Sequence, residues 1–159
     1  MESDSASVRP EHLEVSVLDL QEVVIDIPHV EDVARRTAVA EGATGELSIV
    51  FVDAQKMSEM NSQYRDECGP TDVLSFSIDG LIAGGVQPGD DPPFLIGEVI
   101  VCPEVAALQA TEGIDSEIDL LVAHGILHLL GFDHDTEESA QIMRGREKRH
   151  TGREGARAR

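Results

Sequence analysis

Cysteine, long apolar runs and positive charge are all scarce in this sequence of 159 residues. The two cysteines, Cys68 and Cys102, lie far apart and lack the spacing of metal ligands, so we expect reduced thiols rather than a disulfide framework or a cysteine metal site. No stretch approaches the roughly 20 apolar residues of a membrane span. The first residues also lack the basic and apolar regions of a secretory signal. We therefore expect a cytoplasmic protein with no membrane partner.

Positive charge is scarce because 12 Lys and Arg residues face 31 Asp and Glu residues, which gives a formal net charge of −19. Such a surface excludes indiscriminate attraction to polyanions. Seven of the cations fall in the last sixteen positions, which leaves a tail of about +5 on a body of about −24. A solvated, disordered tail is the favoured interpretation, and nucleic-acid binding through it is the alternative. The tail cations are Arg144, Arg146, Lys148, Arg149, Arg153, Arg157 and Arg159.

The apolar pattern predicts one α/β domain over residues 13–149, between a disordered N-terminus of residues 1–12 and a basic, disordered tail of residues 150–159. Alternating or β-branched apolar runs predict strands over 13–18, 46–52, 73–78 and 95–101. Helical spacing predicts helices over 28–40, 54–64, 103–110 and 137–148, and one more that carries three histidines. Residues 79–95 are rich in Gly and Pro and too long for an ordinary connection, so we expect a mobile loop of a kind that is often functional.

The most informative segment is residues 120–134, which read LLVAHGILHLLGFDH and contain three of the six histidines. His124 and His128 are four residues apart, so on a helix both imidazoles project from one face. Gly131 suits the left-handed position that ends a helix, which would let the chain double back and bring His134 to the same point. Three neutral imidazoles with an open fourth position are typical of catalytic zinc, so we predict that His124, His128 and His134 bind one zinc ion.

Parts of this segment have a second interpretation. A lone histidine on an apolar helix face is usually a satisfied core residue, although three at this spacing favour a metal site. Asp133 either orients one of the imidazoles or is only a loop carboxylate. The ligand set does not separate zinc from nickel or cobalt, although availability favours zinc. At the start of the helix, Ser116 and Asp119 resemble a capping box.

The ligand spacing His-x-x-x-His-x-x-Gly-x-x-His is that of the metzincin peptidases, which place a glutamate directly after the first histidine. That position is Gly125 here, so the general base of zinc peptide hydrolysis is missing and a peptidase is disfavoured. Water bound to zinc, with a pKa of about 7, still supplies hydroxide. This suffices for a phosphodiester, where a guanidinium stabilises the charge that develops on the phosphoryl oxygens.

A second segment supplies a guanidinium at Arg65, which by its position alone is an ordinary helix-end arginine. Together the two segments resemble the YbeY family of zinc-dependent endoribonucleases. The resemblance extends over residues 13–148 and rests on five blocks. These are Asn61-x-x-Tyr64-Arg65, Pro70 to Phe76, Gly97-Glu98-Val99-Ile100, His124 to His134 and Met143-x-x-x-Glu147.

The resemblance implies a small α/β fold in which a four-stranded mixed sheet is flanked by about five helices, with a cleft between the histidine helix and the Arg65 segment. It marks His124, His128 and His134 as metal ligands, and Arg65 and His124 as catalytic residues. The implied function is that of a single-strand-specific, metal-dependent endoribonuclease in 16S rRNA 3′-end maturation and ribosome quality control. The implied partners are ribosomal RNA, small-subunit ribosomal proteins and an assembly GTPase.

Two departures set this chain apart from the family pattern. The stretch after Arg65 reads Asp66-Glu67-Cys68-Gly69, where relatives usually carry Gly-Lys-Asp, so a cation that would meet a phosphate is missing. The body is also acidic, whereas an RNA enzyme normally keeps a basic face. A positive channel survives if Arg35, Arg36, Lys56 and Arg65 converge on the cleft with the tail. The acidic body keeps an alternative open, a zinc-stabilised ribosome-assembly factor with little or no nuclease activity.

Overall fold

The structure of the protein is a computed structural model that describes residues 13–77 and 95–152. The expected disordered N-terminus, the expected loop over residues 79–95 except its last residue, and the last seven residues of the basic tail lie outside the described residues. No helix within the two described ranges is long and apolar enough to cross a membrane.

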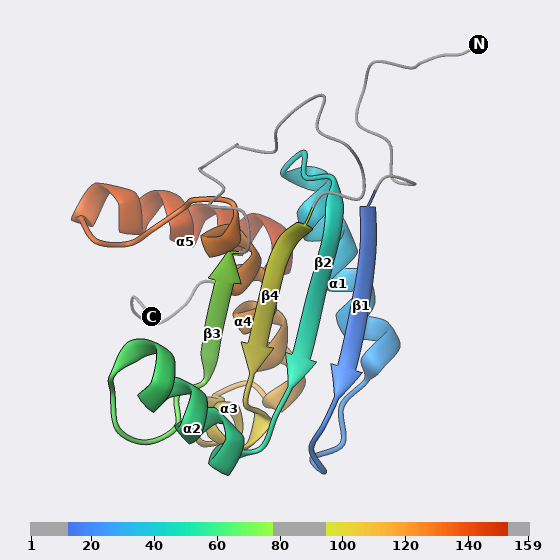
Figure 1. Cartoon of the computed structure of the whole chain (residues 1–159). Coiled ribbons are helices and arrows are strands. Elements are labelled where there is room, and N and C mark those ends of the chain that lie inside the picture. Colours follow the sequence, from blue (N-terminus) through green and yellow to red (C-terminus); the bar gives the residue numbers. More distant parts are fainter. Residues whose placement is uncertain (1–12, 78–94, 153–159) are drawn as a thin grey trace.

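Four strands form one mixed sheet: β1 (Leu13–Asp19), β2 (Gly45–Phe51), β3 (Val73–Ser77) and β4 (Leu95–Val101). Their order across the sheet is β1-β2-β4-β3, with β2 parallel to both neighbours and β3 antiparallel to β4. The opposed arrow of β3 is visible at one edge of the sheet in Figure 1. The predicted α/β fold with a four-stranded mixed sheet is confirmed, and β3 is an edge strand.

Five helices lie in the described ranges: α1 (Ile27–Ala40), α2 (Ala54–Arg65), α3 (Pro103–Gln109), α4 (Ile114–Leu129) and α5 (Glu137–Thr151). Asp26 caps α1 by accepting the backbone N–H of His29, and Asp53 caps α2 in the same way through Lys56. The predicted helices are present with ends shifted by a few residues. The largest shift is in α5, which continues three residues beyond Lys148 into the segment expected to begin the tail.

Two apolar clusters lie on opposite faces of the sheet. The larger one packs α1 and α4 against one face, which is the rear face in Figure 1. Helix α4 is apolar on nearly all sides, and most of its residues are buried, as expected for a helix inside a core. Each fully buried Leu or Ile of this helix stabilises the fold by about 1.5–3 kcal/mol. The smaller cluster includes Met57 of α2 and Leu74 of β3 on the other face.

The predicted capping box at Ser116 and Asp119 is wrong. Helix α4 begins at Ile114, and its N-cap is Gly113 with a φ of 102° and no side-chain cap. The Asp119 carboxylate, one turn into the helix, bonds the imidazole Nε2 of His29 at 2.8 Å and so joins α4 to α1. A capping box does open α5, where Thr136 and Ser139 bond each other's backbone N–H groups.

Candidate metal centre and cleft

The first two of the three predicted metal ligands, His124 and His128, lie one turn apart on α4. His124 is only 3% exposed, and His128 is half-buried at the last turn of the helix. Because α4 is held against the sheet by its apolar sides, the two imidazoles are fixed on one face of a rigid element.

The third histidine follows a tight turn that ends α4. Gly131 has a φ of 99°, its N–H donates to His128 O at 3.0 Å, and the N–H of Phe132 donates to Leu127 O at 3.0 Å. These two bonds are the pattern of a Schellman motif, which reverses the chain after a helix. The turn brings His134 back toward α4, as predicted from the position of Gly131.

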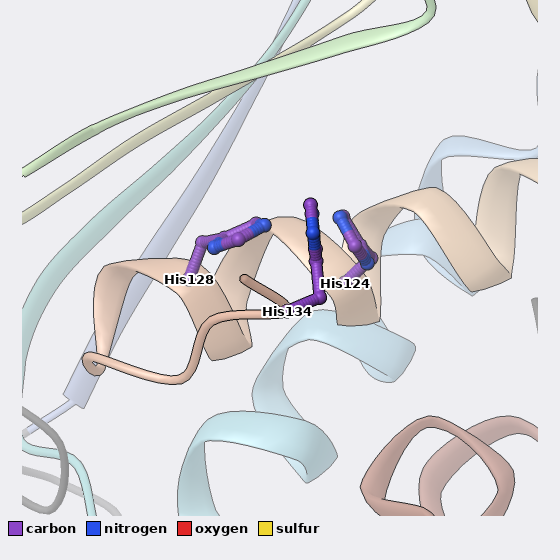
Figure 2. A group of neighbouring side chains, drawn as sticks. All are labelled: His124, His128 and His134. Atoms are coloured by element: carbon purple, nitrogen blue, oxygen red, sulfur yellow. The ribbon is translucent and has the colours of Figure 1, made fainter. Parts of the chain in front are cut away.

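The three imidazoles meet at one point (Figure 2). Each offers a nitrogen, and these nitrogens all lie within 4.8 Å of one another. The ring centroids are 4.6 Å apart for His124 and His128, 5.0 Å for His128 and His134, and 5.6 Å for His124 and His134. The group has the number, type and proximity of donors to hold a metal ion.

The remaining ring nitrogens are arranged as a metal requires. The His124 Nδ1 donates to the Glu147 carboxylate at 2.5 Å, and the His128 Nδ1 donates to the Phe132 carbonyl at 3.0 Å. In these tautomers each Nε2 keeps its lone pair for a ligand bond. The Nε2 of His134 is buried and has no hydrogen-bond partner among the described residues. Because buried polar atoms are rarely left unpaired, this nitrogen fits a bound metal ion.

The protonation of the cluster also suits a metal. Burial, followed by the neighbouring His124 and His134, lowers the pKa of His128 to about 4. At neutral pH the His128 imidazole is therefore uncharged, which is the form that binds a metal.

Glu147 is the site residue that the sequence reasoning missed. It lies on α5, is only 3% exposed, and reaches His124 from 23 positions along the chain. The sequence did point to this residue through the Met143-x-x-x-Glu147 block of the family resemblance. Both residues of the block are buried on the inner face of α5. Among the described residues Asp133 makes no hydrogen bond to an imidazole. Its carboxylate accepts the backbone N–H of His134 at 2.7 Å.

The close packing of α4 on the sheet explains Gly125. A Cβ atom at this position would lie 2.5 Å from Val99 Cγ1 on β4 and 3.1 Å from the Ser75 hydroxyl on β3. Any side chain here would point into the sheet rather than toward the histidines. The position that carries the metzincin glutamate therefore has no room for a general base in this protein.

The histidines open into a cleft of about 650 Å³ that also contains Arg65. The consecutive residues 71–77 line it, so the cleft follows β3 at the edge of the sheet, between the end of α4 and the end of α2. Arg65 is the last residue of α2, and its side chain is 52% exposed. It lies 3.8 Å from Glu67, an exposed ion pair of little energetic weight. The structure thus places Arg65 and all three histidines in one cleft.

The other body cations that the structure describes do not line this cleft. Arg35 pairs with Glu31, Arg36 with Asp32 and Lys56 with Glu59, each along its own helix. Within the described ranges, Arg65 is the one Lys or Arg among the residues that line the cleft. The condition for a positive channel, that the four body cations converge on the cleft, is therefore not met by Arg35, Arg36 and Lys56. The two free cysteines are also separate from the histidine group.

Comparison with protein families gives a match over nearly the whole chain. The family model described as "Endoribonuclease YbeY" matches residues 8–154. A protein of that name from Acidothermus cellulolyticus is 40% identical over 136 residues, which cover 82% of this chain and 76% of the relative. One from Streptomyces coelicolor is 42% identical over 105 residues, or 63% of this chain and 64% of the relative. The aligned part of this chain thus spans slightly less than two thirds of the Streptomyces protein.

A solved structure supports the fold. The solution structure of TM1509 from Thermotoga maritima superposes with a TM-score of 0.59 and covers 86% of each chain. The two sequences are 24% identical, so this likeness concerns the arrangement of helices and strands alone. Among the sequence relatives, one from Beutenbergia cavernae, also named "Endoribonuclease YbeY", is 53% identical over 105 residues, which cover 62% of this chain and 67% of the relative.

Proposed function

The chain belongs to the endoribonuclease YbeY family, and from this premise we propose that it is a metal-dependent endoribonuclease that cuts single-stranded RNA. The observation that carries the proposal is the shared cleft, which holds the three-histidine group together with Arg65. Phosphodiester cleavage needs an electrophilic centre and a cation for the developing charge, and both have candidates here. By family resemblance we propose 16S rRNA 3′-end maturation and ribosome quality control as its roles.

We assign one zinc ion to His124, His128 and His134. The all-imidazole donor set, the neutral His128 and the unpartnered His134 Nε2 support this assignment. A bound zinc ion supplies Lewis acidity toward phosphoryl oxygen and lowers the pKa of water to about 7. The protein holds the ligands for it: Glu147 fixes the tautomer and ring plane of His124, and the Phe132 carbonyl does the same for His128.

We assign to Arg65 the stabilisation of phosphoryl oxygens. Its guanidinium carries five N–H donors in a planar fork that matches phosphate geometry. Among the described residues the side chain pairs with Glu67 alone, and because this ion pair is exposed and weak, the guanidinium can turn toward a phosphate in the cleft. Together with His124, which carries the metal at the buried end of the cleft, Arg65 forms the proposed catalytic pair.

The proposal is tested by cleavage of single-stranded ribosomal RNA with zinc-loaded and metal-stripped protein. We expect cutting only by the zinc-loaded form, and loss of cutting in His124→Ala, His134→Ala and Arg65→Ala. Arg36→Ala is the matched control, since Arg36 is ion-paired on α1 outside the cleft and its loss should leave the rate unchanged. Undiminished cutting by all three site variants would refute the assignment and point to a contaminating nuclease.

A second function is favoured by the acidic surface. With a formal net charge of −19 and one described cation in the cleft, the protein is suited to bind basic ribosomal proteins. In that case it is a zinc-stabilised assembly factor that cleaves poorly or not at all. Metal removal would then lower the melting temperature, whereas binding to a basic ribosomal protein would persist in the folded, metal-free chain and RNA would remain intact.

The family resemblance supports the remaining parts of the proposal. We propose small-subunit ribosomal proteins and an assembly GTPase as partners, and the cytoplasm as the place of action, because ribosomes mature there. We also propose residues 13–149 as the working domain, in keeping with the family match over residues 8–154. Co-purification of tagged protein with small-subunit precursors, and its loss on ribosome depletion, would check the partners.

A further inference from the structure

Tyr64 is the one tyrosine of the chain and lies in the cleft beside Arg65. Its side chain is 58% exposed although it is among the largest in the protein. Single exposed apolar residues are common on protein surfaces, but this ring lines the cavity that also contains the histidines. An exposed aromatic ring in a substrate cleft has a physical use, because it offers a flat surface to a flat ligand.

The ring of Tyr64 is held in place without being covered. It meets Phe76 of β3 with ring centroids 5.2 Å apart and planes at 71°, an edge-to-face contact. In such a perpendicular pair Phe76 covers at most one face of the tyrosine ring, and Tyr64 remains 58% exposed among the described residues. Phe76 itself packs against the smaller apolar cluster. The tyrosine is thus anchored to the edge strand with little conformational freedom to lose on binding.

The protein side chains that line the cleft carry little positive charge. Non-specific binding of nucleic acid normally depends on several Lys or Arg contacts to phosphates. Among the described residues that line this cleft, Arg65 is the one Lys or Arg, and Asp72 and Asp133 oppose it. Stacking of a base on an aromatic ring needs no positive charge and accepts every base.

We propose that Tyr64 is a base-stacking residue, which binds an unpaired nucleobase of the RNA next to the phosphate that Arg65 contacts. The inference rests on the proposed endoribonuclease function and adds to it a reason for single-strand preference. Bases within a duplex are stacked on their neighbours and cannot present a face to a side chain, whereas bases of a single strand can.

The kinetic test compares Tyr64→Ala and Tyr64→Phe in zinc-loaded protein acting on a short single-stranded RNA. Loss of one stacking contact should raise KM about tenfold with little change in kcat. Tyr64→Phe keeps the ring and should stay within about twofold of the wild type. Ile142→Ala is the matched control, since Ile142 is 50% exposed and does not line the cleft. A wild-type KM in Tyr64→Ala would overturn the inference.

A spectroscopic readout separates stacking from a merely structural role. The fluorescence of 2-aminopurine placed in the same RNA is expected to be quenched on binding to the wild type and to Tyr64→Phe, but not to Tyr64→Ala. Equal quenching by Tyr64→Ala would overturn the inference while leaving the endoribonuclease proposal intact. If zinc-loaded wild type neither binds nor cuts the RNA, the endoribonuclease proposal itself fails.

Discussion

The two walls of the cleft are built in opposite ways. On the α4 wall, the imidazoles are buried or half-buried, and Glu147 and the Phe132 carbonyl hold two of them by their second nitrogens. On the α2 wall, Tyr64 and Arg65 are more than half exposed and held by one edge contact and one exposed ion pair. The first wall is preorganised for a small ion, whereas on the second wall the Arg65 side chain is free to turn toward a larger substrate.

This difference shows where substitutions should act. On the α4 wall the imidazoles are buried or half-buried, and those of His124 and His128 are also hydrogen-bonded, so a change there should affect metal affinity and folding together. On the α2 wall the side chains contribute little to the fold, so a change should affect RNA alone.

On the α4 wall the largest effect is expected for Glu147→Gln. The amide can still accept the N–H of His124 but loses the negative charge that makes the imidazole a stronger ligand, so zinc affinity should fall about 10- to 100-fold. Competition with a metal-binding dye measures it. Glu138→Gln, an exposed glutamate at the start of the same helix, serves as the control and should bind zinc like the wild type. Equal zinc affinities of the two variants would show that the charge of Glu147 does not support metal binding.

Next in size is Gly125→Ala. The added Cβ would lie 2.5 Å from Val99 Cγ1, so α4 must shift from the sheet, at a cost of about 1–3 kcal/mol in the free energy of unfolding. Gly145→Ala provides the matched contrast, since a Cβ at this position of α5 meets nothing within 4 Å. That change should stabilise the protein by about 0.5–1 kcal/mol. Urea unfolding of both variants measures the difference, and a neutral Gly125→Ala would contradict the close packing.

A smaller effect concerns pH and the metal-free protein. The pKa of His128 lies near 4 in the fold, below its ordinary value of 6.5, so the unfolded chain takes up this proton first. The contribution of the neutral His128 imidazole to the free energy of unfolding is fully present above pH 6.5 and is lost as the pH falls toward about 4. Because the side chain is only part-buried, we expect a loss of about 1–2 kcal/mol. The difference in melting temperature between wild type and His128→Gln should shrink over this interval, and a constant difference would contradict the shift.

Local features of the site were predictable from the sequence. The spacing of His124 and His128 and the glycine at position 131 act through helix geometry and a turn that involve only neighbouring residues. The partners of these residues were not predictable in the same way. Glu147 reaches His124 from another helix, Asp119 bonds His29 at a distance of 90 positions, and α4 begins at Ile114 without a side-chain cap. Such contacts depend on how the elements pack.

The same limit applies to the sheet. Strand positions followed from alternating apolar residues, but the order β1-β2-β4-β3 depends on which strands pair, and no run of residues states this. The edge position of β3 is what opens the cleft beside Phe76 and Tyr64. The resemblance of the Arg65 block to a known family, rather than any spacing, predicted that this segment faces the histidines.

The most direct test of the two-wall account measures zinc binding, melting temperature and RNA cleavage on one preparation of Arg65→Ala. We predict one bound zinc ion and a melting temperature equal to that of the wild type, because the Arg65 side chain is exposed and its ion pair is weak. Cleavage should be about 100-fold slower or more, as when a donor to the transition state is removed. Loss of the zinc ion, or cleavage at the wild-type rate, would contradict the account.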